Sequence, residues 1–344
     1  MRFSSFIMMV IISLVMSAEG LYLNHLNTIN HLSNNKINSI FRDSDGFLWI
    51  GTSSGLYRYD GYTFKNYEPE SAENKDTFDN SIEGIQEDSE GRLWIFSGSK
   101  YSVYDPSTDI MTTEISGILG TSGITGTPAL LYIDSTKSIW LHIQGQGLYR
   151  VSPDFRNAEM VKDDNLKTVQ LTDIESTPDG IVTLDNNGVL KIIDPVDLKV
   201  VRSDSFIADE LGKGNTYVFT FVYDRDRLGW IFSNERLWLY DMTDGKWLND
   251  MLPPMDHRRF VKILEQDRSG NLWIGRDHQG LEQIVKSNDG ISFKKITSEP
   301  SQEDINTVTS IYEDNSRIVW IGTYKKRTLL PSSKYPQVQS LSIQ

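Results

Sequence analysis

Residues 37–67 read INSIFRDSDGFLWIGTSSGLYRYDGYTFKNY and contain four short runs of strand-forming residues separated by turns. In the first turn, Asp43 can accept hydrogen bonds from backbone N–H groups that follow it, and Gly46 can adopt the positive φ of a tight hairpin. A second turn ends at Gly55. Ile, Tyr, Phe, Trp and Thr fill the runs, as expected for a packed, pleated surface. The stretch therefore predicts a compact unit of four β-strands.

The same pattern recurs six more times along the chain, and a tryptophan marks one position in six of the seven copies. The copy without a tryptophan has Thr183 at that position if Gly180 is aligned with Gly46. A period of about 45 residues with four strands per repeat is typical of a β-propeller, in which each repeat is one radial blade. The fold class is therefore predicted to be all-β, a seven-bladed β-propeller, with these tryptophans packed between blades: Trp49, Trp94, Trp140, Trp230, Trp273 and Trp320.

One propeller accounts for residues 21–344. Residues 21–27 look like a fourth strand without the first three, so we expect them to complete the last blade and close the ring. The last repeat then needs only three strands from the C-terminal end. The predicted blades are residues 37–67, 82–114, 128–159, 169–201, 216–248, 260–296 and 308–344.

Residues 1–19 form a separate element that predicts export. Arg2 supplies a positive start, residues 6–15 are apolar, and Ser17 and Ala18 suit cleavage. The alternative is an uncleaved anchor, although the apolar run is short for a membrane span. Together with the complete absence of cysteine, this favours a periplasmic protein. The net charge of −13 argues against nucleic acid as a partner.

The turns between second and third strands share one rim with the loops between blades, and functional residues often lie on such loops. These turns offer amides, hydroxyls and a few charges at the mouth of the central channel, which suits hydrogen bonding to sugar hydroxyls. Ordinary turn composition is the alternative interpretation. The residues predicted to bind ligand are Lys100, Gln144, Gln146, Asn234, Arg236, Arg276 and His278.

No catalytic residue, cofactor or metal site is predicted. The five histidines lack metal-ligand spacing, and no zinc-protease, serine-hydrolase or phosphate-loop motif occurs. A catalytic carboxylate pair remains open, because acidic residues are plentiful. The repeated Asp43, Asp88, Asp267 and Asp314 each lie in a separate blade, so they are predicted to form turns rather than to share a calcium ion.

The pattern Ile-x-x-Ile-x-x-Asp-x-x-Gly-x-Leu-Trp-Ile-Gly-Thr-x-x-Gly-Leu-x-x-Tyr-Asp at residues 37–60 resembles the two-component regulator propeller repeat, and residues 261–281 match almost as well. The chain is similar to the first periplasmic propeller of the hybrid two-component sensors with which gut Bacteroidetes detect polysaccharide fragments. This resemblance implies a non-enzymatic sensing domain with oligosaccharide ligands. In that family a second propeller and a β-sandwich precede the membrane helix and histidine kinase. These two domains are the expected partners, and a homodimer is a further option.

The chain departs from the family after Thr323, where YKKRTLLPSSKYPQVQSLSIQ replaces the expected Gly-Leu strand. We therefore expect a truncated or frame-shifted sensor gene, or a fragment. Two rival functions stay open: a propeller enzyme acting on glycans as a lyase or hydrolase, and a protein-interaction or dimerisation ring.

Overall fold

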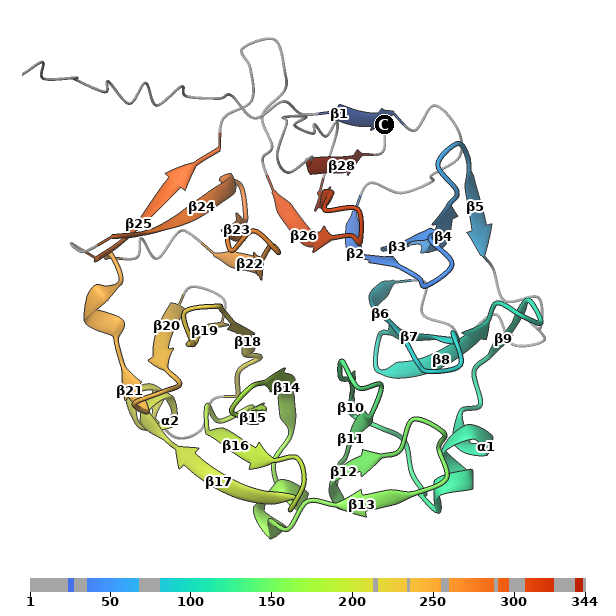
Figure 1. Ribbon diagram of the computed structural model, residues 1–344, viewed down its shortest axis with the longest axis horizontal. Helices are drawn as coiled ribbons and strands as arrows, with labels where there is room; N and C mark the ends of the chain where they lie inside the picture. The colour runs from blue at the N-terminus through green and yellow to red at the C-terminus, as the bar shows by residue number, and fades with distance from the viewer. Residues whose placement is uncertain are drawn as a thin grey trace, which may run out of the picture.

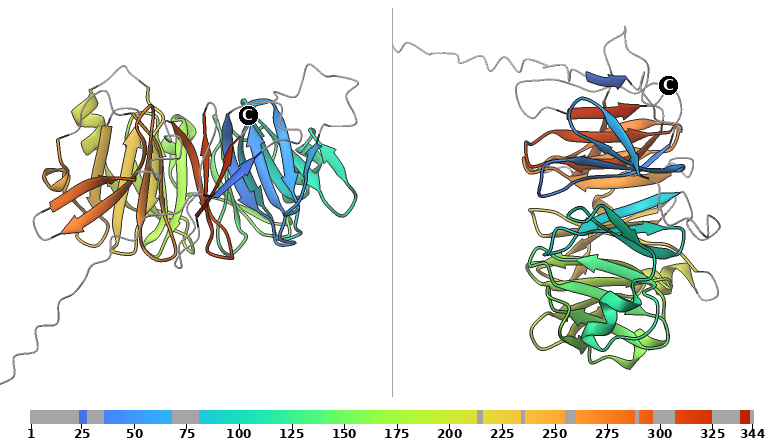
Figure 2. Two further views of the ribbon diagram at one scale, coloured as in Figure 1. Left: turned by 90° about the horizontal axis from the view of Figure 1, so that it is seen from above. Right: turned by 90° about the vertical axis from the view of Figure 1, so that its right-hand side faces the viewer.

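The structure is a computed structural model that describes residues 24–27, 36–67, 81–212, 216–233, 236–254, 260–287, 290–296, 307–324 and 338–342. The predicted export signal, residues 1–19, lies outside the described residues. Figure 1 shows the sheets arranged radially around a central opening, with the chain passing once around the ring. Figure 2 shows the same ring from its edges.

Six sheets are four-stranded blades that are antiparallel throughout, and in each the strand order follows the chain from the central channel outward (Figure 1). The first blade contains β2 (Ile37–Arg42), β3 (Leu48–Thr52), β4 (Gly55–Tyr59) and β5 (Phe64–Tyr67). The second contains β6 (Ile82–Glu87), β7 (Leu93–Ser97), β8 (Lys100–Asp105) and β9 (Ile110–Thr112). The third contains β10 (Leu130–Ile133), β11 (Ile139–Ile143), β12 (Gly147–Val151) and β13 (Ala158–Met160).

The next three blades repeat this plan. The fourth contains β14 (Leu171–Thr177), β15 (Gly180–Asp185), β16 (Leu190–Asp194) and β17 (Lys199–Asp204). The fifth contains β18 (Thr220–Tyr223), β19 (Leu228–Ser233), β20 (Arg236–Asp241) and β21 (Lys246–Trp247). The sixth contains β22 (Val261–Gln266), β23 (Leu272–Arg276), β24 (Gly280–Ser287) and β25 (Gly290–Lys295). The helices in the described residues are short: α1 (Ser116–Leu119), α2 (Phe206–Leu211), η2 (Gly120–Ser122), η3 (Asp164–Lys167) and η4 (Asn249–Met251).

The sheet that closes the ring differs from these blades, so the described residues form six such blades and the predicted count of seven is not confirmed. It contains the antiparallel pair β26 (Val308–Glu313) and β27 (Val319–Thr323), followed by β28 (Val338–Ser342) and β1 (Asn24–Asn27). Both β28 and β1 pair in parallel with their neighbours. The third strand of the first, third and sixth blades begins with a glycine, at Gly55, Gly147 and Gly280. In the sequence of the last repeat, Lys326 stands six residues after Trp320, where Gly55 stands six residues after Trp49. A parallel pair such as β27 and β28 requires a longer connection than a hairpin.

A hydrogen bond between an aspartate and a tryptophan six residues later explains the turn between the first two strands. Asp43 accepts from the backbone N–H of Phe47 through Oδ1 and from the indole of Trp49 through Oδ2. The corresponding indole bonds of the repeat measure 2.6–3.0 Å, and they join Asp43–Trp49, Asp88–Trp94, Asp134–Trp140, Asp224–Trp230, Asp267–Trp273 and Asp314–Trp320. One carboxylate thus holds both the turn and a buried aromatic side chain.

Each of these tryptophans is at most 4% exposed and packs in a cluster that spans two sheets. Trp49, for example, contacts Ile82 and Ile85 of the second blade, and its ring lies 5.2 Å from that of Tyr104. Trp320 packs against Ile37 of the first blade and so joins the two ends of the ring. The hydrophobic core is therefore a series of inter-blade layers.

The fourth blade lacks the aspartate–tryptophan bond, and its alignment at Thr183 is wrong by one residue. Thr183 pairs with Ile174, as Ile50 pairs with Ile40 in the first blade. Val182 pairs with Glu175, as Trp49 pairs with Phe41 in the first blade. Val182 therefore occupies the tryptophan position. The turn before Gly180 is shorter than the aspartate turns, and Thr177 closes it by donating to the carbonyl of Gly180. Aligning the two glycines therefore shifts the register.

Candidate functional site

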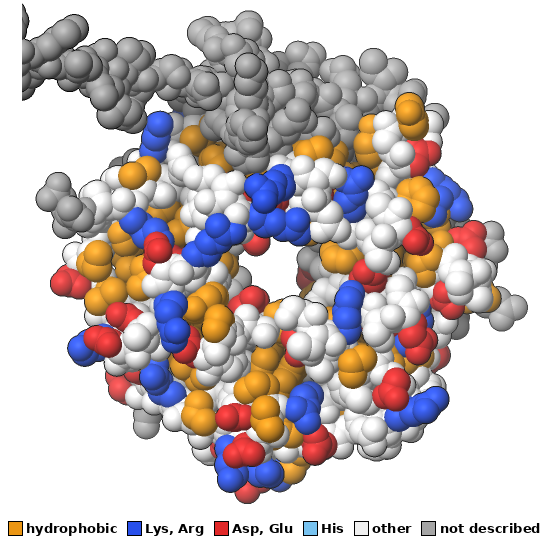
Figure 3. All heavy atoms as spheres, in the orientation of Figure 1, with side chains coloured by type: hydrophobic (Ala, Val, Ile, Leu, Met, Phe, Trp, Pro, Cys, Tyr) orange, Lys and Arg blue, Asp and Glu red, His pale blue; other side chains and the backbone are white. Residues whose placement is uncertain are grey.

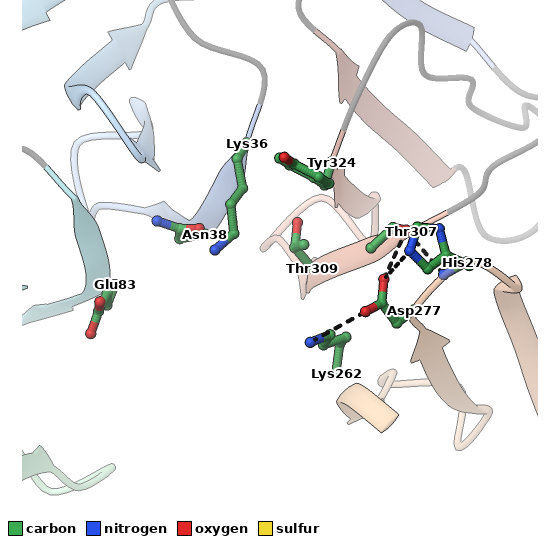
Figure 4. Close-up of a pocket in the computed structure, with 9 residues that line it drawn as sticks. All are labelled: Lys36, Asn38, Glu83, Lys262, Asp277, His278, Thr307, Thr309 and Tyr324. Carbon is green, nitrogen blue, oxygen red and sulfur yellow. Dashed lines mark hydrogen bonds and ion pairs between the residues drawn. The ribbon is translucent and has the colours of Figure 1, made fainter. Parts of the chain in front are cut away.

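A cavity of about 500 Å³ opens at the mouth of the central channel, where the two ends of the ring meet (Figure 4). Its residues come from the first, second and sixth blades and from the closure sheet. They are Lys36, Asn38, Glu83, Lys262, Asp277, His278, Thr307, Thr309 and Tyr324. We call this cavity the closure pocket.

Four of these residues reach the pocket because of a β-bulge at the start of each inner strand. Asn38, Glu83, Lys262 and Thr309 are each the second residue of their strand, and the pairing with the next strand skips each of them. A bulge turns the extra side chain away from the regular alternation. Side chains of four different sheets therefore converge on one space.

Asp277 organises one wall of the closure pocket. Its Oδ1 accepts a hydrogen bond of 3.1 Å from the Thr307 hydroxyl, which itself accepts from the backbone N–H of His278. The Lys262 ammonium lies 3.6 Å from Asp277 Oδ2, and His278 Nε2 lies 3.7 Å from Oδ1 (Figure 4). This carboxylate is therefore held in place from three sides.

Lys36 and Tyr324 form the opposite part of the pocket, where an isolated β-bridge joins the two residues. The side chain of Tyr324 points toward Lys36 (Figure 4), and the residue is 41% exposed. Lys36 has no ion pair with any residue in the described part of the chain. The pocket therefore presents an ammonium group, an aromatic face, hydroxyls and an amide to one bound molecule.

Of the seven ligand-binding residues predicted from sequence, His278 lines this pocket, and Asn234 lies outside the described residues. Lys100 is exposed at the start of β8. Gln144 and Gln146 lie in the turn before β12, where the Gln146 amide donates to the Thr125 carbonyl. Arg236 pairs with Glu210 at 2.9 Å. The structure does not bring these residues together.

Arg276, which was predicted to bind ligand, is fully buried. Its Nε lies 2.5 Å from Oε2 of Glu282, and its guanidinium stands 4.8 Å from the centre of the Phe293 ring. Arg276 is the last residue of β23 and Glu282 belongs to the adjacent strand β24, so the pair lies within one sheet. This ion pair makes burial of the charge possible.

Eight of the nine pocket residues were not predicted from the sequence. One feature of the sequence could have identified four of them. A polar residue follows the first Ile or Val of several repeats, at Asn38, Glu83, Lys262 and Thr309. Recognising that position as a bulge requires the strand register, which a single repeat does not reveal.

The channel wall holds a second group of ionisable residues, next to a cavity of about 300 Å³ between β14, β18 and β22. Burial raises the pKa of Asp173 and of Glu265 to about 7, and in Glu265 the nearby charge of Glu313 adds to the effect. Burial also raises the pKa of Glu175 well above its ordinary value. The Asp173 carboxylate accepts a 2.6 Å hydrogen bond from the backbone N–H of Phe221 and so links two blades.

Among the described residues, no group of three His, Asp or Glu side chains is arranged to hold a metal ion. In the same part of the chain, no helix is long and apolar enough to cross a membrane.

A family model described as "two component regulator propeller" matches residues 31–54 and 303–325. These two segments are similar to the two-component regulator propeller repeat. The two matched segments are adjacent at the ring closure, since β2 packs against β26 and β27. Five of the nine residues of the closure pocket belong to them: Lys36, Asn38, Thr307, Thr309 and Tyr324. A comparison with curated proteins finds no match.

Two similar solved structures are extracellular domains from B. thetaiotaomicron that are described as hybrid two component systems. The BT3049 domain has a TM-score of 0.65 and 18% sequence identity, and the match covers 88% of this chain and 41% of the BT3049 chain. The BT4673 domain has a TM-score of 0.62 and 19% sequence identity, and the match covers 90% of this chain and 40% of the BT4673 chain. The WD40 propeller domain of Doa1 has a TM-score of 0.52 and 13% sequence identity, and the match covers 84% of this chain and 90% of the Doa1 chain. These likenesses show the propeller fold, and the chain spans about two fifths of the first two structures.

Proposed function

We propose that this chain is the ligand-sensing propeller of an extracytoplasmic two-component receptor and that it binds an oligosaccharide in the closure pocket. The observation that carries the proposal is the overlap between the pocket and the two segments matched by the regulator family. The extracellular fold relatives support a sensing role outside the cytoplasm. The predicted export signal agrees with that location.

The chemistry of the closure pocket suits a sugar. Asn38, Thr309 and Asp277 supply hydrogen-bonding groups of both kinds, and the half-exposed ring of Tyr324 offers a flat apolar surface. Ligand pockets commonly combine an aromatic surface with a few well-placed polar groups. A saccharide ring presents the matching pair of features, with hydroxyls around its edge and C–H groups on its faces.

In this proposal the closure sheet acts as the seventh blade, and ligand binding across it couples the two ends of the ring. A second propeller and a β-sandwich, or a second copy of the chain, would pass the signal on. The length of the fold relatives, of which this chain spans about two fifths, supports additional domains in such receptors.

A thermal-shift screen of residues 21–344 against plant and host oligosaccharides tests the proposal. A ligand at one hundred times its dissociation constant should add about 2.7 kcal/mol to the free energy of unfolding. Tyr324→Ala and Asn38→Ala should abolish the shift. Tyr62→Ala is the matched control, because Tyr62 is 91% exposed and is not part of the pocket. A cooperative melt without a shift for any saccharide, or unchanged binding by both pocket variants, would count against the proposal.

The enzymatic alternative has one observation in its favour, since carboxylates with raised pKa values often mark catalytic sites. Asp173, Glu175 and Glu265 have this property, but they line the channel wall and not the closure pocket. Analysis of the sugars after the same screen decides between the functions: intact sugar supports sensing, and cleavage that is lost in Glu265→Gln supports catalysis.

A further inference from the structure

The face of the ring opposite the closure pocket carries an arginine in each of three consecutive sheets. Arg225, Arg268 and Arg317 lie in the turns that follow β18, β22 and β26, whereas the pocket residues lie at the starts of inner strands. All three arginines are exposed. On the face seen in Figure 3, Lys and Arg side chains gather along one edge of the central opening. We call these three residues the arginine arc.

Two arginines of the arc, Arg225 and Arg268, each reach from one turn to the next along the ring. The Arg225 guanidinium donates to the backbone carbonyl of Arg268, and the Arg268 guanidinium donates to the Asn315 side chain at 2.8 Å. Both contacts leave further N–H groups of each guanidinium available to solvent. The arc is therefore an ordered row of donors along the channel rim.

The charges of the arc are not neutralised by ion pairs in the described part of the chain. Neighbouring cations on the same face do have partners: Arg42 pairs with Asp314, Arg227 with Asp179, and Lys286 with Asp224 and Asp226. The Glu313 carboxylate accepts a hydrogen bond from the backbone N–H of Arg268. The protein has a net charge of −13, so three guanidinium groups without ion pairs are a local departure from its overall charge.

The composition of the arc indicates the kind of partner. Guanidinium groups bind carboxylate and sulfate oxygens through paired hydrogen bonds. The exposed neighbours Ser269, Ser316 and Asn315 add small polar groups. None of the exposed large hydrophobic residues lies in these turns. Protein partners usually require aromatic or aliphatic anchors, and single-stranded nucleic acid usually requires stacking platforms.

We infer that the arginine arc binds an extended acidic polysaccharide that carries sulfate or carboxylate groups. This site is separate from the closure pocket, and a long polymer held on one face leaves the pocket on the other face free for a short saccharide. The inference does not depend on which saccharide the pocket binds.

Binding of heparin and of polygalacturonate to the full chain, followed by calorimetry at low and at physiological salt, tests this inference. The triple variant Arg225→Gln, Arg268→Gln, Arg317→Asn should weaken binding of at least one polymer by about tenfold or more. The matched control Lys199→Gln, Lys294→Gln, Lys295→Gln removes the same charge from exposed positions on outer strands and should change affinity less than about twofold. Asn is chosen at Arg317 because the backbone there has a φ of 62°.

The single variant Arg317→Asn is a control for loss of binding through misfolding. In the described part of the chain, the Arg317 side chain makes no hydrogen bond or ion pair that the substitution would remove. It should weaken binding measurably while the melting temperature stays unchanged. The inference is overturned if neither polymer binds, if the lysine control loses as much affinity as the arc variant, or if duplex DNA or polyglutamate of equal charge binds more tightly. Tyr324→Ala should leave polymer binding intact, which separates this result from a failure of the pocket proposal.

Discussion

Glu265 is one residue through which pH affects the stability of the fold. It faces the channel from β22, no hydrogen bond to its carboxylate is present in the described part of the chain, and the charges near it are the carboxylates of Glu313 and Glu175. Burial raises its pKa from 4.5 to about 7, so the folded protein binds this proton more tightly than the unfolded chain. The stability contributed by Glu265 is therefore complete below pH 4.5 and is lost as the pH rises through 7.

Glu265→Gln should remove this pH dependence, because the amide stays neutral. We expect the variant to raise the free energy of unfolding by about 1 to 3 kcal/mol above neutral pH and to have little effect near pH 4.5. Urea unfolding across this pH range measures the difference. Glu114→Gln, at an exposed position, is the control and should leave the profile unchanged. If Glu265→Gln changed the free energy of unfolding equally at pH 4.5 and above neutral pH, the raised pKa of Glu265 would be contradicted.

At the scale of the strands, the glycine that follows Trp-Ile determines how closely adjacent blades approach. A Cβ on Gly275 in β23 would lie 2.5 Å from Cγ2 of Ile263 and 2.6 Å from Cγ1 of Val308 in the next sheet. Gly51 and Gly322 are equally crowded by Ile82 and Ile37. The motif Trp-Ile-Gly-Thr thus combines a buried aromatic residue with a gap that admits the next inner strand.

Gly275→Ala should destabilise the protein by about 1 to 3 kcal/mol, because the methyl group would displace β26 or distort β22. Gly120→Ala is the control, since its Cβ would meet open space and its φ is −61°. Chemical denaturation of both variants measures the difference. If Gly275→Ala were as stable as Gly120→Ala, the inter-blade spacing would not be set at this position.

For the whole molecule, closure of the ring depends on two distant parts of the chain. β1 forms the outer edge of the closure sheet and pairs with β28 over four residues. Removing residues 1–27 should lower the melting temperature and increase aggregation, because β28 then presents an unpaired edge. Removing residues 1–20 keeps β1 and is the matched control. Thermal melting with light scattering distinguishes the two proteins, and identical behaviour would show that β1 does not stabilise the ring.

The repeat, its four-stranded unit and the turns at Asp43, Asp88, Asp267 and Asp314 can be predicted from the sequence alone. These features are local: an Asp bonds N–H groups within the same turn, a Gly permits a positive φ there, and side chains alternate along each strand. They are visible in residues 37–67 alone. The second role of Asp43, as acceptor for the Trp49 indole, also lies within this stretch, but it becomes evident only when the side chains are in place.

The positions of the candidate sites depend on how the sheets pack together in the ring. The closure pocket requires four bulges from four sheets and the contact between residues some 270 positions apart, such as the Thr309 hydroxyl and the Ile37 carbonyl. The burial of Arg276 depends on its neighbour Glu282 across the strand, and the parallel pairing of β28 depends on how the ring ends meet. Each repeat specifies its own sheet, but the convergence of side chains from different sheets depends on the closure of the whole ring.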